Sequence, residues 1–356
     1  MKKALSLILA LAMVFALAAC GKKDEAPSTH DASGDGSYPK LQLSISTSGG
    51  DTGIDTIAAN HFADLISEKT DGQITARVYP QAQLTGGDQS KVAEMLAAGG
   101  SFEFGICSGA NLSSLSNAFQ THQLPFLYTS YAEAEAAFDG AGGEAYAEIL
   151  DGKGITYVGA LHNGLRHFTT TKTAIYTPDD LKGLKMRIPS GEVGMAVFKA
   201  LGADPVTINF SELYTALQMG TADGQENGYD TCAGANLQEV QHYVTESAWQ
   251  YDAWIVVANK ASLAGYDDAS REAILEAWNE TITWARESMV ERDEAAKQKF
   301  IDAGATIIEL TDEQHQAFVD AVNDVKMSFV DKYGEDICRA FGVIDCQGRE
   351  ALLTHP

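Results

Sequence analysis

The stretch "LKMRIPSGEVGMAVFKALGADPVTINFSELYTALQMGTADGQEN", residues 184–227, is highly informative about the fold. It alternates short apolar runs, bounded by glycine or proline, with longer segments whose apolar residues recur every three or four positions. The pattern predicts strands at 184–189, 204–209 and 222–226, separated by helices at 191–202 and 210–220. Strand–helix repeats of this length are typical of an α/β fold with a mostly parallel sheet.

The rest of the chain continues this alternation and indicates two lobes. Strands are predicted at 40–47, 72–80, 101–109 and 155–164, and helices at 54–69 and 86–100. The strand-like segment 247–260 is long enough to cross between domains. Residues 268–303 contain no proline or glycine, which predicts one long helix or two helices end to end. A single helix would be ~50 Å long, more than one small domain spans, so it would bridge two lobes.

The charge balance excludes some partners and makes the arginines informative. The 356 residues include 25 Lys and Arg against 49 Asp and Glu, a formal net charge of −24. Such a chain repels nucleic acid and anionic lipid surfaces. If it bound a small anion, its few cations would have to lie together. Between Tyr79 and Ser270 the only arginines are Arg166 and Arg187.

The first residues read as a lipoprotein signal peptide over 1–20. A basic start, "MKK", precedes the apolar run "ALSLILALAMVFA" and then "LAAC", which resembles a lipobox ending at Cys20. Lipidation of Cys20 would anchor an exported protein on the outer face of the cytoplasmic membrane; the alternative is an ordinary signal peptide with a chance cysteine. Residues 21–38 are polar and predict a flexible tether. No other segment approaches eighteen consecutive apolar residues.

Four more cysteines remain: Cys107, Cys232, Cys338 and Cys346. An exported protein can form disulfides, and Cys338 and Cys346 are close enough in sequence to close a small loop. The alternative is two unpaired thiols. No CxxC, HExxH or histidine-rich spacing indicates a metal site, so none is expected.

Polar side chains follow several of the predicted strands, where ligands bind in open α/β sheets. They are Ser108, Asn111, Arg166, Arg187 and Asn227. Guanidinium and amide groups suit an anion and are poor acids or bases. Strict alternation along 184–189, however, would place Arg187 on the solvent face, and Arg166 and Asn227 would be loop and turn residues. There is no nucleophile elbow, P-loop or dinucleotide fingerprint, so no catalysis and no cofactor are expected.

The block 183–230 closely resembles the core signature of the DctP-like solute-binding proteins of TRAP transporters (tripartite ATP-independent periplasmic transporters). The resemblance continues in "VYPQAQLTGGD", "LPFLY", "NGLRHFTTTKTAIYTPDDLKG" and "LQEVQHYVT", and it covers nearly all of 40–335. It implies a two-lobed, type II-like periplasmic-binding-protein fold with a hinge and a long lobe-spanning helix. Lobe I would comprise 39–163 plus 252–288, and lobe II 164–251 plus 289–356.

The resemblance also implies roles for single residues. Arg187 matches the arginine that pairs with the substrate carboxylate, Arg166 a second ligand-facing arginine, and Asn227 an amide that holds the same carboxylate. Phe210 matches a pocket-wall aromatic, Ser108 and Asn111 lie where selectivity varies, and Trp249 and Tyr251 lie near the hinge-side wall. Two features depart from the family pattern. Gly228 replaces the usual proline after "QEN", and "STSGGDTG" lacks the histidine or asparagine often found after the first strand.

The implied function is an extracytoplasmic receptor that binds an organic acid in an interlobe cleft. It would act as a monomer and deliver the acid to the small and large integral membrane subunits of a TRAP transporter. Two alternatives stay open. One is a ligand-sensing lobe for a signalling partner. The other is an enzyme on the same scaffold, with His167 or Glu103 as acid or base.

Overall fold

The computed structural model describes residues 38–189 and 191–348. The predicted signal peptide, Cys20 and nearly all of the predicted tether lie outside this part. Among the helices of the described residues, none is long and apolar enough to cross a membrane.

The predicted strand–helix repeat is confirmed. It forms β5 (Lys185–Ile188), α7 (Glu192–Ala200), β6 (Asp204–Thr207), α8 (Phe210–Gln218) and β7 (Gly224–Asn227). Strand β5 lies between β6 and β7 and is parallel to both. Both helices bury one side: Val193, Val197 and Phe198 on α7, and Leu213 and Leu217 on α8. The helical spacing of such apolar positions was the basis for predicting these two helices.

A second parallel unit precedes it in the chain. It comprises β1 (Leu41–Thr47), α2 (Ile54–Lys69), β2 (Ile74–Tyr79), α3 (Lys91–Ala98) and β3 (Phe104–Ser108). Strand β1 pairs with β2 on one side and β3 on the other, both parallel. The carboxyl ends of these strands therefore share one edge of the sheet.

Two long antiparallel strands join the two units. They are β4 (Ile155–Thr170) and β8 (Tyr243–Asn259), and both extend beyond the predicted segments. The described strands form one nine-stranded sheet in the order β2-β1-β3-β8-β4-β7-β5-β6, with β9 (Thr306–Glu309) beside β8. The sheet is thus parallel towards both ends and antiparallel in the middle. Gly164, at φ 119°, lies at a register shift opposite Asp252. The two predicted lobe boundaries meet at this irregularity.

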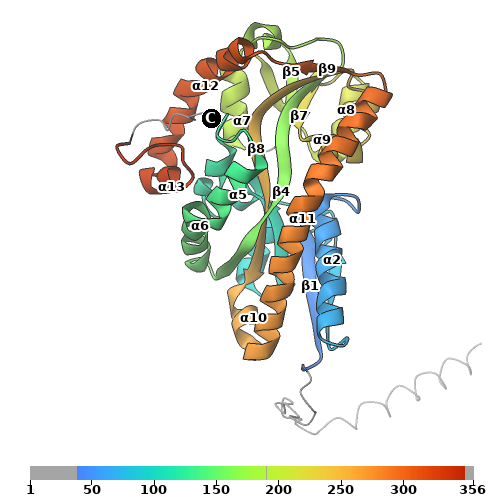
Figure 1. The fold of residues 1–356 in the computed structure, drawn as a ribbon, viewed down its shortest axis with the longest axis vertical. Coiled ribbons are helices and arrows are strands. Elements are labelled where there is room, and N and C mark those ends of the chain that lie inside the picture. The colour runs from blue at the N-terminus through green and yellow to red at the C-terminus, as the bar shows by residue number, and fades with distance from the viewer. Residues whose placement is uncertain (1–37, 190, 349–356) are drawn as a thin grey trace, which may run out of the picture. The chain divides into compact units, whose positions relative to one another are not determined.

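A single helix, α11 (Asp268–Asp302), runs along the sheet from one parallel unit to the other (Figure 1). Its 35 residues correspond to ~52 Å, which confirms the prediction of one long helix. It packs against α2, β4 and α9 (Tyr229–Gly234). Arg292 joins these regions because its guanidinium donates to the carbonyl of Thr52 at 2.8 Å and pairs with Asp230 at 2.8 Å.

The remaining helices complete the fold. They are α4 (Gly109–Leu112), η2 (Asn117–Gln123), α5 (Tyr131–Asp139), α6 (Ala141–Asp151), α10 (Lys260–Gly265), α12 (Asp312–Tyr333) and α13 (Glu335–Ala340), with short 3-10 turns at Gln83–Thr85, Pro178–Leu181 and Leu237–Glu239. Helix α12 packs on α7, and α13 packs on α6 (Figure 1). The carboxyl-terminal helices therefore contact both predicted lobes.

The proposed disulfide is absent from this structure. Cys338 and Cys346 are both free thiols. Cys338 lies on the buried side of α13, in the hydrophobic core, whereas Cys346 is exposed, so the two side chains occupy different environments. Proximity in sequence did not bring them together, because the helical turns of α13 direct Cys338 inward.

Asp55 anchors the loop between β1 and α2. Its Oδ2 accepts a hydrogen bond of 2.6 Å from the amide of Gly49, while Oδ1 is buried without a partner among the described residues. The carboxyl group lies so close to the backbone that a Cβ on Gly49 would approach its Oδ1 to 2.3 Å. Burial raises the pKa of Asp55 to about 6, although backbone hydrogen bonds oppose the shift.

This pKa predicts a specific dependence of stability on pH. The folded state holds the Asp55 proton up to about pH 6, and the unfolded state releases it near 3.8. The favourable contribution of the protonated Asp55 to the stability of the folded state is therefore fully present below about pH 4, and it is lost as the pH rises to 6. The difference between the pKa values of Asp55 in the folded and unfolded states corresponds to roughly 3 kcal/mol in the free energy of unfolding.

We expect Asp55→Asn to gain stability relative to the wild type as the pH rises from about 4 to 6. Urea denaturation at several pH values across this range measures the gain. Asp51→Asn, which replaces an exposed residue of the same loop, is the control. Its stability should change with pH in parallel with that of the wild type. Parallel curves for Asp55→Asn would contradict the assignment.

Candidate functional site

Arg187 lies one residue before the end of strand β5, in a covered position. Its Nε donates a hydrogen bond of 2.9 Å to the carbonyl of Ile208, and its guanidinium lies 5.9 Å from the ring centre of Phe210. The residue is only 3% exposed. The solvent-facing position that simple alternation predicts is therefore wrong. Alternation gives the face of the strand, but the turn after β6 and the start of α8 cover that face.

The charge of Arg187 is not compensated by a direct partner. Its Nη1 and Nη2 make no hydrogen bond or ion pair with any described residue. Burial lowers the pKa of Arg187 to about 10; Glu226 opposes this shift, and Arg166 adds to it. The group remains a cation at neutral pH. A buried cation without a counter-ion is unfavourable, so this site favours an incoming anion.

Arg166 is already paired. It lies within β4 rather than in the loop that its sequence suggests. Its Nε and Nη2 donate to the two carboxylate oxygens of Glu226 at 2.5 and 2.9 Å, and its Nη1 lies 3.4 Å from an oxygen of Asp252. Burial lowers the pKa of Arg166, but the attraction of Glu226 outweighs it and the net pKa lies above the ordinary value. The structure thus assigns Arg166 to an internal network, where it supports the site.

Asn227 lies on the same face of the sheet as Arg187. Arg187 is the register partner of Gln225, and side chains two residues apart on a strand share a face. Asn227 Nδ2 donates to Gln225 Oε1 at 2.7 Å, and Gln225 Nε2 donates to Thr169 Oγ1 at 2.8 Å. This chain fixes the Asn227 amide and leaves its Oδ1 unused among the described residues.

The backbone of Gly228 has dihedral angles that the family's proline could also adopt. Its φ is −68° and its ψ is 159°, values that proline also adopts. A Cβ there would meet the carbonyl of Asn163 at 3.2 Å. The replacement of proline by Gly228 therefore leaves the dihedral angles of this turn within the range of proline.

Ser108 and Asn111 form the turn after β3. Ser108 Oγ accepts from the amide of Asn111 at 3.3 Å and so caps α4. Asn111 Nδ2 makes only a long contact, 3.5 Å, with Gln89 Oε1, and Gln89 Nε2 donates to the carbonyl of Ser48 at 2.8 Å. Both predicted residues are buried, and Gln89 links their turn to the loop after β1.

The β3 turn lies against the segment that follows Arg187. A Cβ on Gly191, four residues after Arg187, would lie 3.0 Å from Gln120 Oε1 and 3.8 Å from the Cβ of Ala110. The carboxyl ends of β3 and β5 are thereby brought together across the long strand pair. No pattern in the sequence marks Gln120, because a glutamine in a short 3-10 segment carries no recognisable motif.

Trp249 and Tyr251 lie in the core behind the site rather than on its wall. Each is 1% exposed. Trp249 Nε1 donates to Glu226 Oε2 at 3.1 Å, and Tyr251 OH lies 2.7 Å from His162 Nδ1. Trp249 therefore supports the carboxylate that holds Arg166. Phe210 is 40% exposed and remains a candidate for the rim of the site.

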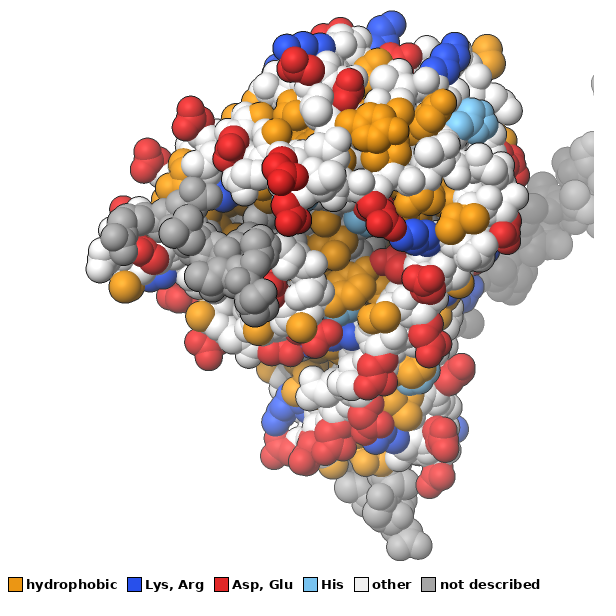
Figure 2. All heavy atoms as spheres, turned by 45° about the horizontal axis from the view of Figure 1, so that its top comes forward, with side chains coloured by type: hydrophobic (Ala, Val, Ile, Leu, Met, Phe, Trp, Pro, Cys, Tyr) orange, Lys and Arg blue, Asp and Glu red, His pale blue; other side chains and the backbone are white. Residues whose placement is uncertain are grey.

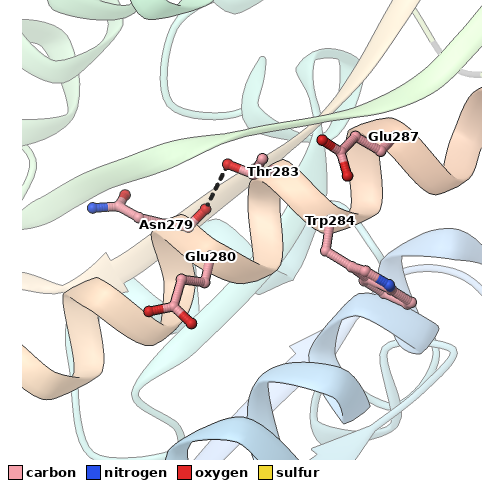
Figure 3. A pocket seen from close by; sticks show the side chains of 5 residues that line it. All are labelled: Asn279, Glu280, Thr283, Trp284 and Glu287. Carbon is pink, nitrogen blue, oxygen red and sulfur yellow. Dashed lines mark hydrogen bonds between the residues drawn. The ribbon is translucent and has the colours of Figure 1, made fainter.

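A shallow depression lies elsewhere, on the outer surface of α11. Asn279, Glu280, Thr283, Trp284 and Glu287 line it (Figure 3). Trp284 points towards α2, where its ring stacks on His61 at 4.0 Å. Two glutamates make this depression unsuitable for an anion. Acidic side chains are also spread widely over the face drawn in Figure 2, in line with the acidic composition.

Comparisons with known proteins agree with this architecture. Residues 45–332 match the model of the family described as bacterial extracellular solute-binding protein, family 7 (DctP). The 2,3-diketo-L-gulonate-binding periplasmic protein YiaO of Escherichia coli K12 is 31% identical over 287 residues, 80% of this chain and 86% of the relative. The C4-dicarboxylate-binding periplasmic protein DctP of Rhodobacter capsulatus is 31% identical over 284 residues, 79% of this chain and 84% of the relative.

Solved structures show the same fold. A TRAP periplasmic solute-binding protein of Shewanella oneidensis with bound succinate aligns with a TM-score of 0.79 and 29% identity, over 85% of this chain and 98% of that one. The sugar acid binding protein DctPAm of Advenella mimigardefordensis, in complex with galactonate, aligns with a TM-score of 0.79 and 26% identity, over 86% and 97%. The family match and the two-lobed neighbours establish that this chain belongs to the DctP family of TRAP solute-binding proteins.

Proposed function

We propose that this protein is an extracytoplasmic receptor that binds the carboxylate of an organic acid at Arg187, with the amide of Asn227 beside it. One observation carries the proposal: the buried guanidinium of Arg187 has two nitrogens without a partner among the described residues. A carboxylate matches such a planar fork with two parallel hydrogen bonds. The loaded receptor would then deliver its ligand to TRAP membrane subunits.

The relatives support an acid as the ligand class. Those named above are described as binding 2,3-diketo-L-gulonate, C4-dicarboxylates, succinate and galactonate. All of these ligands carry at least one carboxylate. The unpaired guanidinium of this chain supplies the complementary charge.

Three finer features belong to the same proposal. Cys20, after the lipobox-like "LAAC", would carry a lipid that anchors the receptor to the membrane. The lobes would be 39–163 plus 252–288 and 164–251 plus 289–356. The facing positions of Gly164 and Asp252 at a register shift support this division. The receptor would act as a monomer.

An enzymatic function finds less support in the described site. Burial lowers the pKa of His167 to about 4, so this residue is a weak base at neutral pH. Glu103 precedes β3, at the strand end opposite Ser108, where its carboxylate accepts from the amide of Ser44 at 2.7 Å. Glu103 therefore lies away from the carboxyl ends of β3 and β5, near which Arg187 is placed.

Calorimetric titration of the purified protein with carboxylic acids and with their primary amides tests the proposal. We expect at least one acid to bind, and its amide to bind at least 100-fold more weakly, because only the carboxylate neutralises Arg187. Equal affinity for an acid and its amide would contradict a carboxylate site.

A further inference from the structure

Asp293 lies on α11 beside the register shift of β4. A Cβ on Gly164 would lie 3.6 Å from Asp293 Oδ2 and 3.4 Å from the hydroxyl of Tyr131. Asp293 Oδ2 is hydrogen-bonded to this hydroxyl, and its Oδ1 accepts a hydrogen bond of 3.0 Å from the amide of Asp230. One partly buried carboxyl group therefore contacts α5, α9 and the irregular point of β4 together.

The contact with Tyr131 crosses the proposed boundary between the lobes. Tyr131 belongs to the first lobe, whereas Asp293 and Asp230 both belong to the second. Arg292, the residue before Asp293, crosses the same boundary where it donates to the carbonyl of Thr52 at 2.8 Å. If the lobes separate, Tyr131 moves away from Asp293 and water reaches the carboxyl group. When the lobes close, the carboxyl group is covered again.

The proposed lobes are in contact across the site in this structure. A Cβ on Gly191 would lie 3.0 Å from Gln120 Oε1, and Arg187 is 3% exposed. A carboxylate held by Arg187 would be enclosed in this arrangement. The closed lobes, with Asp293 covered, are therefore the form that suits ligand binding.

The hydrogen bonds of Asp293 permit either charge state. As a carboxylate, Asp293 accepts from both partners. As a neutral acid, it donates from Oδ2 to the hydroxyl of Tyr131 while Oδ1 still accepts from the amide of Asp230, so neither contact is lost. The cover over Asp293 and the neighbouring carboxylate of Asp230 both favour the neutral form.

The surrounding groups set the net effect. Burial raises the pKa of Asp293 to about 6, and the charge of Asp230 acts in the same direction. The hydrogen bonds from Tyr131 and from the Asp230 amide oppose the shift, as does the charge of Arg292. His162 stacks on Tyr131 at 4.3 Å; burial lowers the pKa of His162 to about 4, so its ring is largely neutral above about pH 5.

We propose that Asp293 is a positioning residue at the hinge, which takes up a proton as the lobes close on the ligand, so that binding is tighter in acid. This role, which rests on the proposed function, adds a proton to the binding step. The covered carboxyl group holds its proton up to about pH 6, and the carboxyl group exposed to water releases it near 3.8. Between these pH values closure takes up a proton, so affinity rises as the pH falls.

Calorimetric titration of the full chain tests this role. The probes are succinate, galactonate, D-glucuronate and 2,3-diketo-L-gulonate, and the tightest binder is titrated at about pH 7.5 and about pH 5. From pH 7.5 to pH 5, the affinity of the wild type should rise up to about 10-fold more than that of Asp293→Asn. The asparagine cannot take up a proton, yet its amide can keep both hydrogen bonds, so its unfolding temperature should not fall. Protonation of the ligand itself affects both proteins equally.

Asp55→Asn is the matched control. Burial also raises the pKa of Asp55 to about 6, but this residue lies at the start of α2 and bonds to the amide of Gly49. Asp55→Asn should keep the pH dependence of the wild type. Equal pH dependence in the wild type and Asp293→Asn, or its loss in Asp55→Asn, would overturn the role of Asp293 and leave the carboxylate receptor standing. Binding of no acid at either pH would contradict the proposed function and this role with it.

Discussion

Replacing Arg187 with methionine should reduce affinity for the organic acid by roughly 100- to 1000-fold or more. Methionine keeps most of the side-chain length but removes the charge. The ligand carboxylate would then be buried without a counter-ion, which costs on the order of 3–5 kcal/mol. Calorimetry with any acid that binds the wild type measures the loss.

The same substitution should change the stability of the ligand-free protein only slightly. It removes the hydrogen bond from Arg187 to the carbonyl of Ile208, worth about 1 kcal/mol. It also removes a buried charge that lacks a partner, which offsets that loss. Lys185→Met, which replaces an exposed cation of the same strand, is the control and should bind normally. Normal binding by Arg187→Met would refute the assigned role.

Glu226→Gln should have the largest effect on stability. Glu226 is 1% exposed and accepts hydrogen bonds from Arg166 at 2.5 and 2.9 Å and from Trp249 at 3.1 Å. Without its charge, the buried guanidinium of Arg166 loses its main counter-ion, so we expect a loss of about 3–5 kcal/mol in the free energy of unfolding. Urea denaturation monitored by circular dichroism measures it.

The control for Glu226→Gln is the same substitution in an exposed pair. Glu280 contacts Lys69 at 2.6 Å on the surface, where water screens the charges, so Glu280→Gln should change stability far less. The two variants would then distinguish the roles of the two arginines. Arg187→Met should lose ligand binding, and Glu226→Gln, which removes the counter-ion of Arg166, should lose stability. Similar losses of stability in Glu226→Gln and Glu280→Gln would contradict the supporting role of the Arg166 network.

Local patterns predicted most of the elements in this fold. Apolar spacing between glycines and prolines located β5, α7, β6, α8 and β7, and the absence of both residues over 268–303 located α11. The full length of β4 was missed. Gly164 lies in its middle and reads as a strand end, yet it occupies a register shift at φ 119° and the strand continues to Thr170.

The site was harder to predict because its contacts join residues that are distant in the sequence. Arg166 and Glu226 are 60 residues apart and meet only because β4 and β7 are neighbours. No local pattern distinguishes this paired arginine from the unpaired Arg187. Likewise, Trp249 and Tyr251 follow a strand pattern, but only the packed structure shows that both rings point into the core.

A crystal structure of the protein with its tightest-binding acid would show whether Arg187 holds the carboxylate. We expect both carboxylate oxygens to lie about 3 Å from the Nη1 and Nη2 atoms of Arg187, with Arg166 still paired to Glu226. A carboxylate bound elsewhere, with Nη1 and Nη2 of Arg187 still unpaired, would contradict it.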